Sequence, residues 1–419
     1  MAETGSVAGG RLTDWISLGV LTSQVPADAV DDAVAVTGKK AQRRGGKLPP
    51  RVTAYLVMAL ALFADEDYEE VAARLAGTLA DWGGWEESWG RVPTSGGITQ
   101  ARQRLGPEPM AELFSQVVVP VAGLDTGGAF LGPWRLMSID GMEWDVPDTA
   151  ANREAFGVHV AGGGEAAFPK VRVVTVSECA SHAPVLAAMG PAGGGKGSGE
   201  RSLARALYPR LEEDWLLIAD RNFFDWDAWR AAAASGAALL WRVKSDIRLP
   251  ALELLPDGSY RSVLIRPGTS PKQRQALIEA ARRGDDLDPD RARPVRVIEY
   301  DVPDREGDGK GELIALVTTI TDRRRAPAAV LAAAYHQRWE HENGNAQLKT
   351  YLRGPGKILR SASPDMVKQE LWGYLLTHYA ISALICTAAT SAGIDPDRVK
   401  FKRTVRVIRR RVADPAFSP

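Results

Sequence analysis

The sequence predicts a mixed α/β fold that follows an all-α N-terminal domain, and three observations support this prediction. Residues 12–122 hold apolar residues at helical spacing throughout. From about residue 134, short runs rich in Val, Ile and Leu alternate with helical segments, as in α/β domains. Two long helical segments begin at Pro327 and Pro364, because the first turn of a helix tolerates proline.

The N-terminal domain is expected at residues 12–125, after a glycine-rich, disordered segment at 1–11. Its predicted helices cover residues 25–36, 51–63, 68–79, 98–105 and 107–118. The last two are joined at Gly106 and form a candidate helix–turn–helix pair, in which Arg102 and Arg104 would enter a DNA groove. An ordinary αα-hairpin explains these residues equally well.

A sheet domain is expected at residues 130–244 and 326–392. Its predicted strands cover 136–146, 171–178, 184–189, 215–219 and 238–243, and its predicted helices cover 200–211 and 227–234. The first three strands follow one another through short turns, as in an antiparallel meander, whereas the last two alternate with helices. This order matches a ribonuclease H-like mixed sheet flanked by helices.

A β-rich insertion is expected at residues 245–325, because its patterns break the alternation of strands and helices. The runs at 295–302 and 313–319 are predicted to form a hairpin around a turn at 304–311. The stretch 267–294 is rich in proline and charge, and no element is predicted there. Residues 393–419 are expected to form a basic C-terminal tail.

The composition excludes several classes of protein. The only cysteines are Cys179 and Cys386, so neither a disulfide framework nor a structural zinc site is expected. The first 25 residues lack the pattern of a secretory signal. The apolar stretch 371–392 contains His378 and several hydroxyl side chains, which favours a buried core helix over a membrane span. We therefore expect a cytoplasmic protein with no membrane partner.

The charge of the chain is balanced overall but uneven along its length. The formal net charge is zero, yet residues 398–411 hold eight Lys or Arg and no acid. Such a basic segment can bind phosphate groups even when the total charge is nil. A solvated basic tail is an equally good interpretation.

Two aspartates occupy positions that are typical of a metal site. Asp140 lies inside an apolar strand, where a charge is costly unless it is paired or bound to metal. Asp220 directly follows the apolar run WLLIA, at the carboxyl end of a predicted strand, where open α/β sheets place ligands. The alternative is that each aspartate caps a turn, and Asp-Arg-Asn at 220–222 suits a turn well.

A third group lies on the predicted helix 327–352. Tyr335, Arg338, Glu342 and Lys349 have offsets of zero, three, seven and fourteen, so on a regular helix they span about 60° of its circumference. The carboxylate can hold a metal ion, and the cations can hold phosphates. An i,i+4 salt bridge between Arg338 and Glu342 is the alternative, but it leaves Tyr335 and Lys349 unexplained.

The run YHQRWEHENGNAQLK, from Tyr335 to Lys349, matches the Y-x2-R-x3-E-x6-K signature of the IS4 family of DDE transposases at all four positions. The segments SIDGMEWDVPDT and LLIADRNFF resemble the first and second aspartate motifs of that family. One departure is Asn222, where the family usually has glycine; asparagine tolerates a left-handed turn, so a small effect is expected.

The resemblance implies a bacterial, nucleoid-associated DNA transposase. Its catalytic and metal-binding residues would be Asp140, Asp220 and Glu342, with two Mg²⁺ ions as cofactor and Mn²⁺ as a substitute. Tyr335, Arg338 and Lys349 would contact DNA. The partners would be double-stranded terminal inverted repeats and target DNA, bound by a homodimer. The alternative is a domesticated or defective copy that binds DNA without cleaving it.

Several other features receive simpler interpretations. The segment 190–198 nearly fits a phosphate-binding loop, but glycine occupies position 197, where Ser or Thr should coordinate Mg²⁺, so no nucleotide cofactor is expected. His336 and His341 lie off the predicted stripe and are expected on the surface. Trp339 is expected to pack against neighbouring residues. Some IS4-type relatives hold a flipped base with a tryptophan of the insertion; Trp241 precedes the insertion and has no secure match to it.

Overall fold

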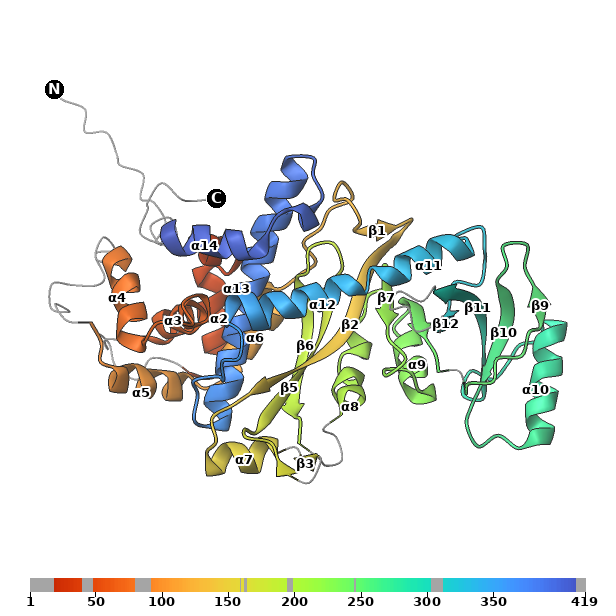
Figure 1. The fold of residues 1–419 in the computed structure, drawn as a ribbon, viewed down its shortest axis with the longest axis horizontal. Coiled ribbons are helices and arrows are strands. Elements are labelled where there is room, and N and C mark those ends of the chain that lie inside the picture. The colour runs from red at the N-terminus through yellow and green to blue at the C-terminus, as the bar shows by residue number, and fades with distance from the viewer. Residues whose placement is uncertain are drawn as a thin grey trace. The chain divides into compact units, whose positions relative to one another are not determined.

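The computed structural model describes residues 19–39, 48–79, 92–158, 160–161, 164–193, 199–244, 246–302 and 312–411. The chain forms two compact units, whose elements are labelled in Figure 1. Unit 1 contains Met1–Val121, Trp144–Val171 and Asn345–Pro419, and unit 2 contains Ala122–Glu143 and Arg172–Gly344. This division differs from the predicted domain boundaries, because the segment from Asn345 onward groups with the N-terminal helices.

Unit 1 is built from helices. Its helices before the sheet are α1 (Gly19–Gln24), α2 (Ala27–Val36), α3 (Pro50–Leu62), α4 (Tyr68–Leu79), α5 (Ser95–Leu105) and α6 (Glu108–Val117). The later elements are α7 (Ala150–Phe156), β3 (Val160–Ala161), β4 (Gly164–Glu165), the π-helix η5 (Gln347–Leu352), α13 (Pro364–Ser391), η6 (Pro396–Arg398) and α14 (Phe401–Arg411). The helices predicted at 25–36, 51–63 and 68–79 are confirmed, as are the two joined at Gly106.

The core of unit 1 is the pair α3 and α13. Both helices are apolar around most of their circumference, and α13 packs along α3. Gly373 allows this close approach, because a Cβ added there would lie 2.7 Å from Cγ1 and 2.9 Å from the carbonyl oxygen of Val57. Helix α13 is long and apolar enough to cross a membrane, but 78% of its most apolar window is buried. The prediction of a buried core helix is confirmed.

The basic segment at the C-terminal end is helical rather than an extended tail. Helix α14 buries Phe401, Val405 and Ile408, which lie on one face at a spacing of four and three. The opposite face carries exposed basic residues, among them Arg403 and Arg406. The apolar positions thus fold this segment onto unit 1, and its positive charge remains at the surface.

Unit 2 is built on one sheet. Within the described residues ten strands follow the order β6-β5-β2-β7-β8-β12-β11-β10-β9, with β1 paired to β2. The first strands are β1 (Phe130–Leu131), β2 (Trp134–Asp145), β5 (Lys170–Glu178), β6 (Pro184–Pro191), β7 (Trp215–Ala219) and β8 (Ala238–Arg242). Strands β2, β7 and β8 are parallel neighbours. The order β6-β5-β2-β7-β8 is the predicted ribonuclease H-like order, and the mixed α/β fold is confirmed.

The insertion continues this sheet. Its strands are β9 (Glu253–Leu254), β10 (Tyr260–Ile265), β11 (Ala292–Val302) and β12 (Glu312–Thr318), and β12 pairs antiparallel with β8. Strands β11 and β12 are antiparallel, as the predicted hairpin requires. The turn predicted at 304–311 lies outside the described residues. Helix α10 (Pro271–Arg283), which we did not predict, is capped by Ser270 and packs Leu277 and Ile278 against β10.

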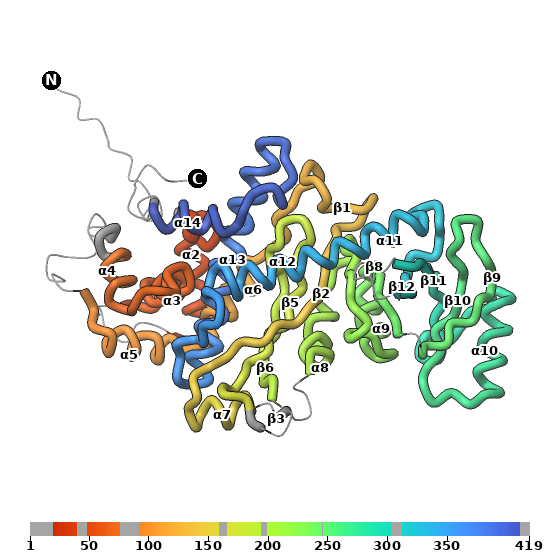
Figure 2. Tube along the Cα trace, viewed as in Figure 1, coloured from red at the N-terminus to blue at the C-terminus, as the bar shows by residue number. Residues whose placement is uncertain are grey.

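The remaining helices of unit 2 are α8 (Glu200–Arg205), η4 (Tyr208–Arg210), α9 (Trp226–Ala233), α11 (Ala328–His336) and α12 (Trp339–Ala346). Figure 2 shows α11 and α12 running in succession across the sheet strands. The prediction of one regular helix over 327–352 is wrong. Around Arg338 the backbone forms i→i−3 hydrogen bonds, from Gln337 to Ala334 and from Arg338 to Tyr335, and this tighter turn separates α11 from α12.

Candidate active site

Asp140 and Asp220 lie side by side on neighbouring strands. In the parallel pairing of β2 with β7, Ile139 is the partner of Ala219, so the two aspartates follow at equivalent places. Neighbouring strands are about 4.8 Å apart. Both aspartates are half-buried at the point where β7 ends. The carboxyl end of a buried strand thus brings together two acids that are 80 residues apart in the sequence.

Glu342 lies on α12, and its neighbour His341 attaches that helix to the sheet. Ser138 Oγ lies 2.8 Å from His341 Nδ1, and Thr175 Oγ1 lies 2.9 Å from His341 Nε2. His341 is 2% exposed, and burial lowers its pKa to about 3, so the ring is neutral at pH 7. The prediction of a surface position for His341 is wrong, whereas His336 is exposed as predicted.

Arg338 lies among the three carboxylates of Asp140, Asp220 and Glu342. Its Nη1 is 3.1 Å from Glu342 Oε1, which is the i,i+4 ion pair considered from the sequence. The charges of all three acids act on its guanidinium. Burial opposes the charge of Arg338, but Tyr335 and the three carboxylates outweigh this effect and raise its pKa. The Arg338 guanidinium is therefore close enough to all three acids to interact with them electrostatically.

Burial is the main influence on Asp140. It raises the pKa of this carboxyl group above its ordinary value, and the charge of Asp220 raises it further. The backbone N–H of Gly141, 2.8 Å from Asp140 Oδ1, and the Arg338 guanidinium both lower it, but they do not cancel the effect of burial. The folded protein thus resists an ionised Asp140 in the absence of a further positive charge.

Glu200 is a fourth acid at this edge, and we did not predict it. It is the first residue of α8 and half-buried. Burial raises the pKa of Glu200, and the charge of Asp140 is the next influence. Only its place at the start of a predicted helix was visible in the sequence, where an acid is common for local reasons.

The donor set fits a divalent cation of the Mg²⁺ type, because carboxylate oxygens are the ligands that Mg²⁺ prefers. Tyr335 is 5% exposed. Tyr335 Oη and Arg338 Nε are buried and have no hydrogen-bond partner among the described residues. Buried polar atoms normally have a protein or water partner. The edge of β2 and β7 therefore combines carboxylates with two buried hydrogen-bond donors that have no partner among the described residues.

The other residues predicted to bind DNA lie in unit 1. Lys349 is half-buried in the π-helix η5. Arg104 is exposed on α5. Arg102 is fully buried, and its guanidinium donates to Gln369 Oε1 (2.9 Å), Ser361 Oγ (3.1 Å) and the Tyr68 hydroxyl. This burial favours a structural role for Arg102 and does not support the predicted DNA contact.

Two tryptophans considered from the sequence have different environments. Trp241 is fully buried in β8 and packs against Tyr208 and Trp229, so its ring is part of the core. Trp339 is 55% exposed, and the Arg338 guanidinium lies 5.3 Å from its ring centroid. Trp339 is thus largely exposed rather than packed in the core, and its contact with Arg338 is a cation–π interaction.

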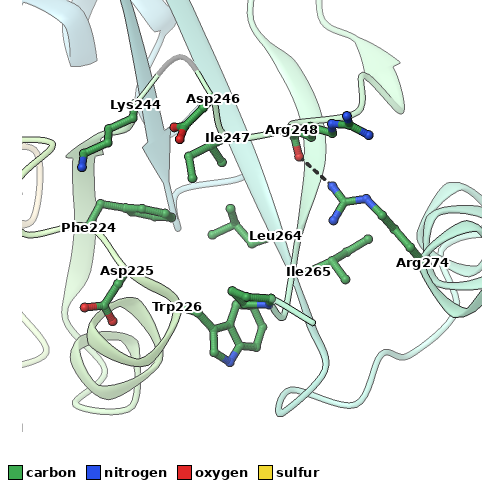
Figure 3. Close-up of a pocket in the computed structure, with 11 residues that line it drawn as sticks. Phe224, Asp225, Trp226, Lys244, Asp246, Ile247, Arg248, Leu264, Ile265 and Arg274 are labelled. Atoms are coloured by element: carbon green, nitrogen blue, oxygen red, sulfur yellow. Dashed lines mark hydrogen bonds between the residues drawn. The ribbon is translucent and has the colours of Figure 1, made fainter. Parts of the chain in front are cut away.

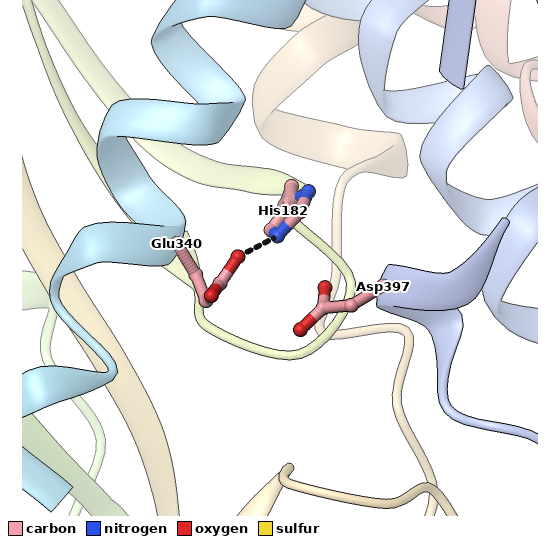
Figure 4. A group of neighbouring side chains, drawn as sticks. All are labelled: His182, Glu340 and Asp397. Atoms are coloured by element: carbon pink, nitrogen blue, oxygen red, sulfur yellow. Dashed lines mark hydrogen bonds and ion pairs between the residues drawn. The ribbon is translucent and has the colours of Figure 1, made fainter. Parts of the chain in front are cut away.

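A second hydrogen bond of α12 involves Glu340, the residue before His341. Its Oε2 lies 3.0 Å from Nε2 of His182, as the dashed line in Figure 4 shows. The His182 hydrogen bond lowers the pKa of Glu340. His182 follows β5 and is, among the described residues, the one non-glycine residue with a positive φ, 59°. Two consecutive residues of α12 therefore bind to the β5 side of the sheet.

Unit 2 also contains an open pocket of about 440 Å³ between the end of β8 and the insertion (Figure 3). Phe224, Trp226, Leu264 and Ile265 supply its apolar wall. Charged side chains line the remainder, namely Asp225, Lys244, Asp246, Arg248 and Arg274. Arg274 donates to the carbonyl oxygen of Arg248 at 3.0 Å. No local sequence pattern predicts this pocket, because its residues come from separate segments of the chain.

Comparisons with known proteins find family matches over most of the chain. Residues 15–115 match the family "Insertion element 4 transposase N-terminal", and residues 134–379 match the family "Transposase DDE domain". The second match alone covers more than half of the chain.

Individual proteins give similar results. The chain is 26% identical over 372 residues to transposase InsG for insertion sequence element IS4 of Escherichia coli (strain K12), covering 88% of this chain and 77% of that protein. It is 26% identical over 186 residues to putative transposase InsZ of the same strain, covering 43% and 58%. A cryo-EM structure of the piggyBac transposase synaptic complex with hairpin DNA aligns with a TM-score of 0.46 and 8% identity, covering 95% and 80%.

Proposed function

The chain belongs to the DDE transposase family, and on this premise we propose that it cleaves and joins DNA at the ends of an insertion sequence. It would bind double-stranded terminal inverted repeats and hydrolyse a strand to free a 3′-hydroxyl. That 3′-hydroxyl would attack a phosphodiester of the target DNA, joining the two strands and releasing a 3′-hydroxyl of the target. The cofactor would be two Mg²⁺ ions, with Mn²⁺ as a substitute, and the DNA complex would contain a homodimer.

The observation that carries this proposal is the placement of Asp140 and Asp220 in equivalent positions on parallel strands, with Glu342 linked to both through Arg338. These three acids are the residues that would hold the cations. Bound divalent cations would stabilise the charge that develops on the attacking and leaving oxygens of the phosphodiester. The mechanism requires several carboxylates at one point, and the parallel pairing of β2 with β7 supports such a placement for Asp140 and Asp220.

The remaining residues of this edge would orient the acids and the DNA. Ser138 and Thr175 fix His341, and this fixes Glu342 relative to the strand that carries Asp140. With the three acids engaged in holding the cations, the Arg338 guanidinium would be free to bind a phosphate, which a planar guanidinium can contact through two N–H groups. Tyr335 would donate its buried hydroxyl to the same assembly.

The surface that binds the duplex outside the active site would be basic. Phosphate contacts dominate the affinity of proteins for DNA and position the duplex. Arg104 on α5 and the exposed arginines Arg403 and Arg406 on α14 are suited to such contacts. Lys349 on η5 would add a contact that the family signature predicts. These residues would contribute to binding, whereas the carboxylates would carry the chemistry.

The test uses a plasmid that carries the DNA flanking the reading frame, incubated with the full chain and Mg²⁺. We expect nicks at the borders of inverted repeats that bracket the gene. Asp220→Asn should reduce the nicking rate by at least about 10³-fold, because one ligand for the cations is lost. Its DNA affinity should change little, since phosphate contacts lie elsewhere.

Asp227→Asn is the matched control, because Asp227 is an exposed acid in the first turn of α9, seven residues after Asp220. It should nick at the wild-type rate. Nicking by Asp220→Asn at the wild-type rate would contradict the assigned site. Retention of the DNA without any nicking by the wild-type protein would instead support the alternative of a non-cleaving, DNA-binding copy.

A further inference from the structure

Glu200 and Asp140 contact the same residue, Gly141. The backbone N–H of Gly141 donates to Asp140 Oδ1 at 2.8 Å. A Cβ added to Gly141 would lie 2.7 Å from both Cγ and Oε1 of Glu200. The Glu200 side chain therefore lies directly against the Cα of Gly141. Two carboxylates from separate elements, β2 and α8, thus converge on a single backbone position.

The acids around Gly141 differ in whether a cationic side chain forms an ion pair with them. Glu143, two residues further along β2, is paired with Arg172 of β5. The Glu200 carboxylate has neither a hydrogen-bond partner nor an ion-pair partner among the described residues. Asp140 is the charged group with the largest influence on it, Arg172 opposes that influence, and the acids Glu143 and Asp220 add to it. A half-buried acid beside other acids is unfavourable unless a cation joins them.

We propose that Glu200 is a fourth carboxylate of the cation site, facing the ion that Asp140 would hold. This inference rests on the proposed function, because that function supplies the cation. Glu200 would take part through its charge and its position against Gly141, rather than only by stabilising the first turn of α8. A side chain at residue 141 would displace Glu200 from this position.

Cation binding without DNA tests this assignment independently of catalysis. Mn²⁺ is titrated into the full chain, and the free ion is followed by electron paramagnetic resonance. Asp140→Asn should lose most of the binding. Glu200→Gln should raise the Kd by at least about tenfold, because a carboxylate oxygen that faces the ion is replaced by a neutral amide. Glu143→Gln is the matched control and should keep the wild-type Kd.

The outcomes separate the inference from the function on which it rests. Loss of Mn²⁺ binding in Asp140→Asn together with a wild-type Kd in Glu200→Gln would overturn the role of Glu200 and leave the three-acid site intact. Unchanged binding in Asp140→Asn as well would overturn the whole site. Glu200→Gln preserves the shape of the side chain, and an unchanged melting temperature would show that the variant is folded.

Gly141→Ala provides a second test that removes no charge. The added methyl group should push Glu200 away from the edge and raise the Mn²⁺ Kd in the wild-type background. In the Glu200→Gln background the same substitution should have little further effect, because the contribution of Glu200 is already lost. This double-mutant cycle isolates the coupling between the two residues. Equal effects of Gly141→Ala in both backgrounds would contradict the proposal.

Discussion

Arg102 in unit 1 and Arg338 in unit 2 are both arginines with largely buried side chains, but their surroundings are opposite. Arg102 is fully buried, and neutral groups, namely Gln369, Ser361 and the Tyr68 hydroxyl, accept its N–H groups. Arg338 is surrounded by acids, and its Nε has no hydrogen-bond partner among the described residues. The Arg102 guanidinium nitrogens are thus all hydrogen-bonded within the protein, whereas Arg338 Nε can still donate to a further ligand.

A polar core and a binding edge differ in whether the protein itself satisfies the buried polar atoms. A structural arginine satisfies its donors within the protein, which is the usual state of buried polar atoms. Around Arg338 three acids act on one guanidinium, and Tyr335 Oη and Arg338 Nε have no hydrogen-bond partner among the described residues. A bound cation and a bound phosphate would relieve both conditions. The same residue type thus stabilises the fold in unit 1 and is expected to serve DNA cleavage in unit 2.

The largest expected effect is on cleavage. Arg338→Gln should reduce the nicking rate by about 10²–10³-fold, the range for the loss of one charged group at a developing charge. Its free energy of unfolding should change by no more than about 1 kcal/mol, because its partner Glu342 is 43% exposed. Nicking assays and urea unfolding measure the two quantities. A large loss of stability with normal nicking would remove the contrast with Arg102.

Arg102→Ala should show the converse pattern. It would lower the free energy of unfolding by about 3 kcal/mol, since it leaves a cavity and unpaired acceptors between α5 and α13. Urea unfolding measures this change. Arg104→Ala, two residues away and exposed, is the matched control, with an expected change within about 0.5 kcal/mol. Equal stability of the two variants would show that the buried network contributes little.

His341 should affect the nicking rate through the position of Glu342. His341→Ala removes the hydrogen bonds to Ser138 and Thr175, so Glu342 would lose its fixed place and nicking should fall about tenfold to a hundredfold. His341→Gln keeps polar atoms on a side chain of similar reach and should restore part of the rate. His336→Ala, on the exposed side of α11, should nick normally. Normal nicking by His341→Ala would contradict this positioning role. So would an impaired His341→Ala whose rate is not partly restored in His341→Gln.

The smallest effect is expected on α14. The double substitution Arg403→Gln and Arg406→Gln should reduce the slope of log K against log salt for DNA binding by about 1–2, because about 0.9 of a counterion is released for each phosphate contact. Nicking at saturating protein should remain at the wild-type rate. DNA binding measured at several salt concentrations gives the slope, and an unchanged slope would exclude phosphate contacts by these two arginines.

The sequence predicted the site best where one local pattern was sufficient. Asp140 was predicted because it interrupts an apolar strand, and Asp220 because it directly follows one. The parallel register of β2 and β7 places these two residues on neighbouring strands at equivalent positions. The helices of unit 1 follow from their apolar period, and the strand order follows from the sequence of elements. These features depend on short-range patterns.

The features that the sequence did not reveal depend on distant partners. Glu200 was missed because its contact with Gly141 joins separate elements across the sheet edge. His341 was misplaced because the prediction assumed one regular helix, whereas i→i−3 hydrogen bonds around Arg338 interrupt the helix between α11 and α12. Arg102 was assigned to DNA because its partner Gln369 lies more than 260 residues away in the chain.

Site-directed backbone cleavage would show whether Asp140, Asp220 and Glu342 share a divalent cation. With Fe²⁺ in place of Mg²⁺, ascorbate and peroxide generate hydroxyl radicals that cut the chain close to the bound ion. We predict fragments that end near residues 140, 220 and 342, that Mg²⁺ suppresses, and that Asp220→Asn does not produce. Cuts at unrelated positions, or at only one of the three, would contradict a shared ion.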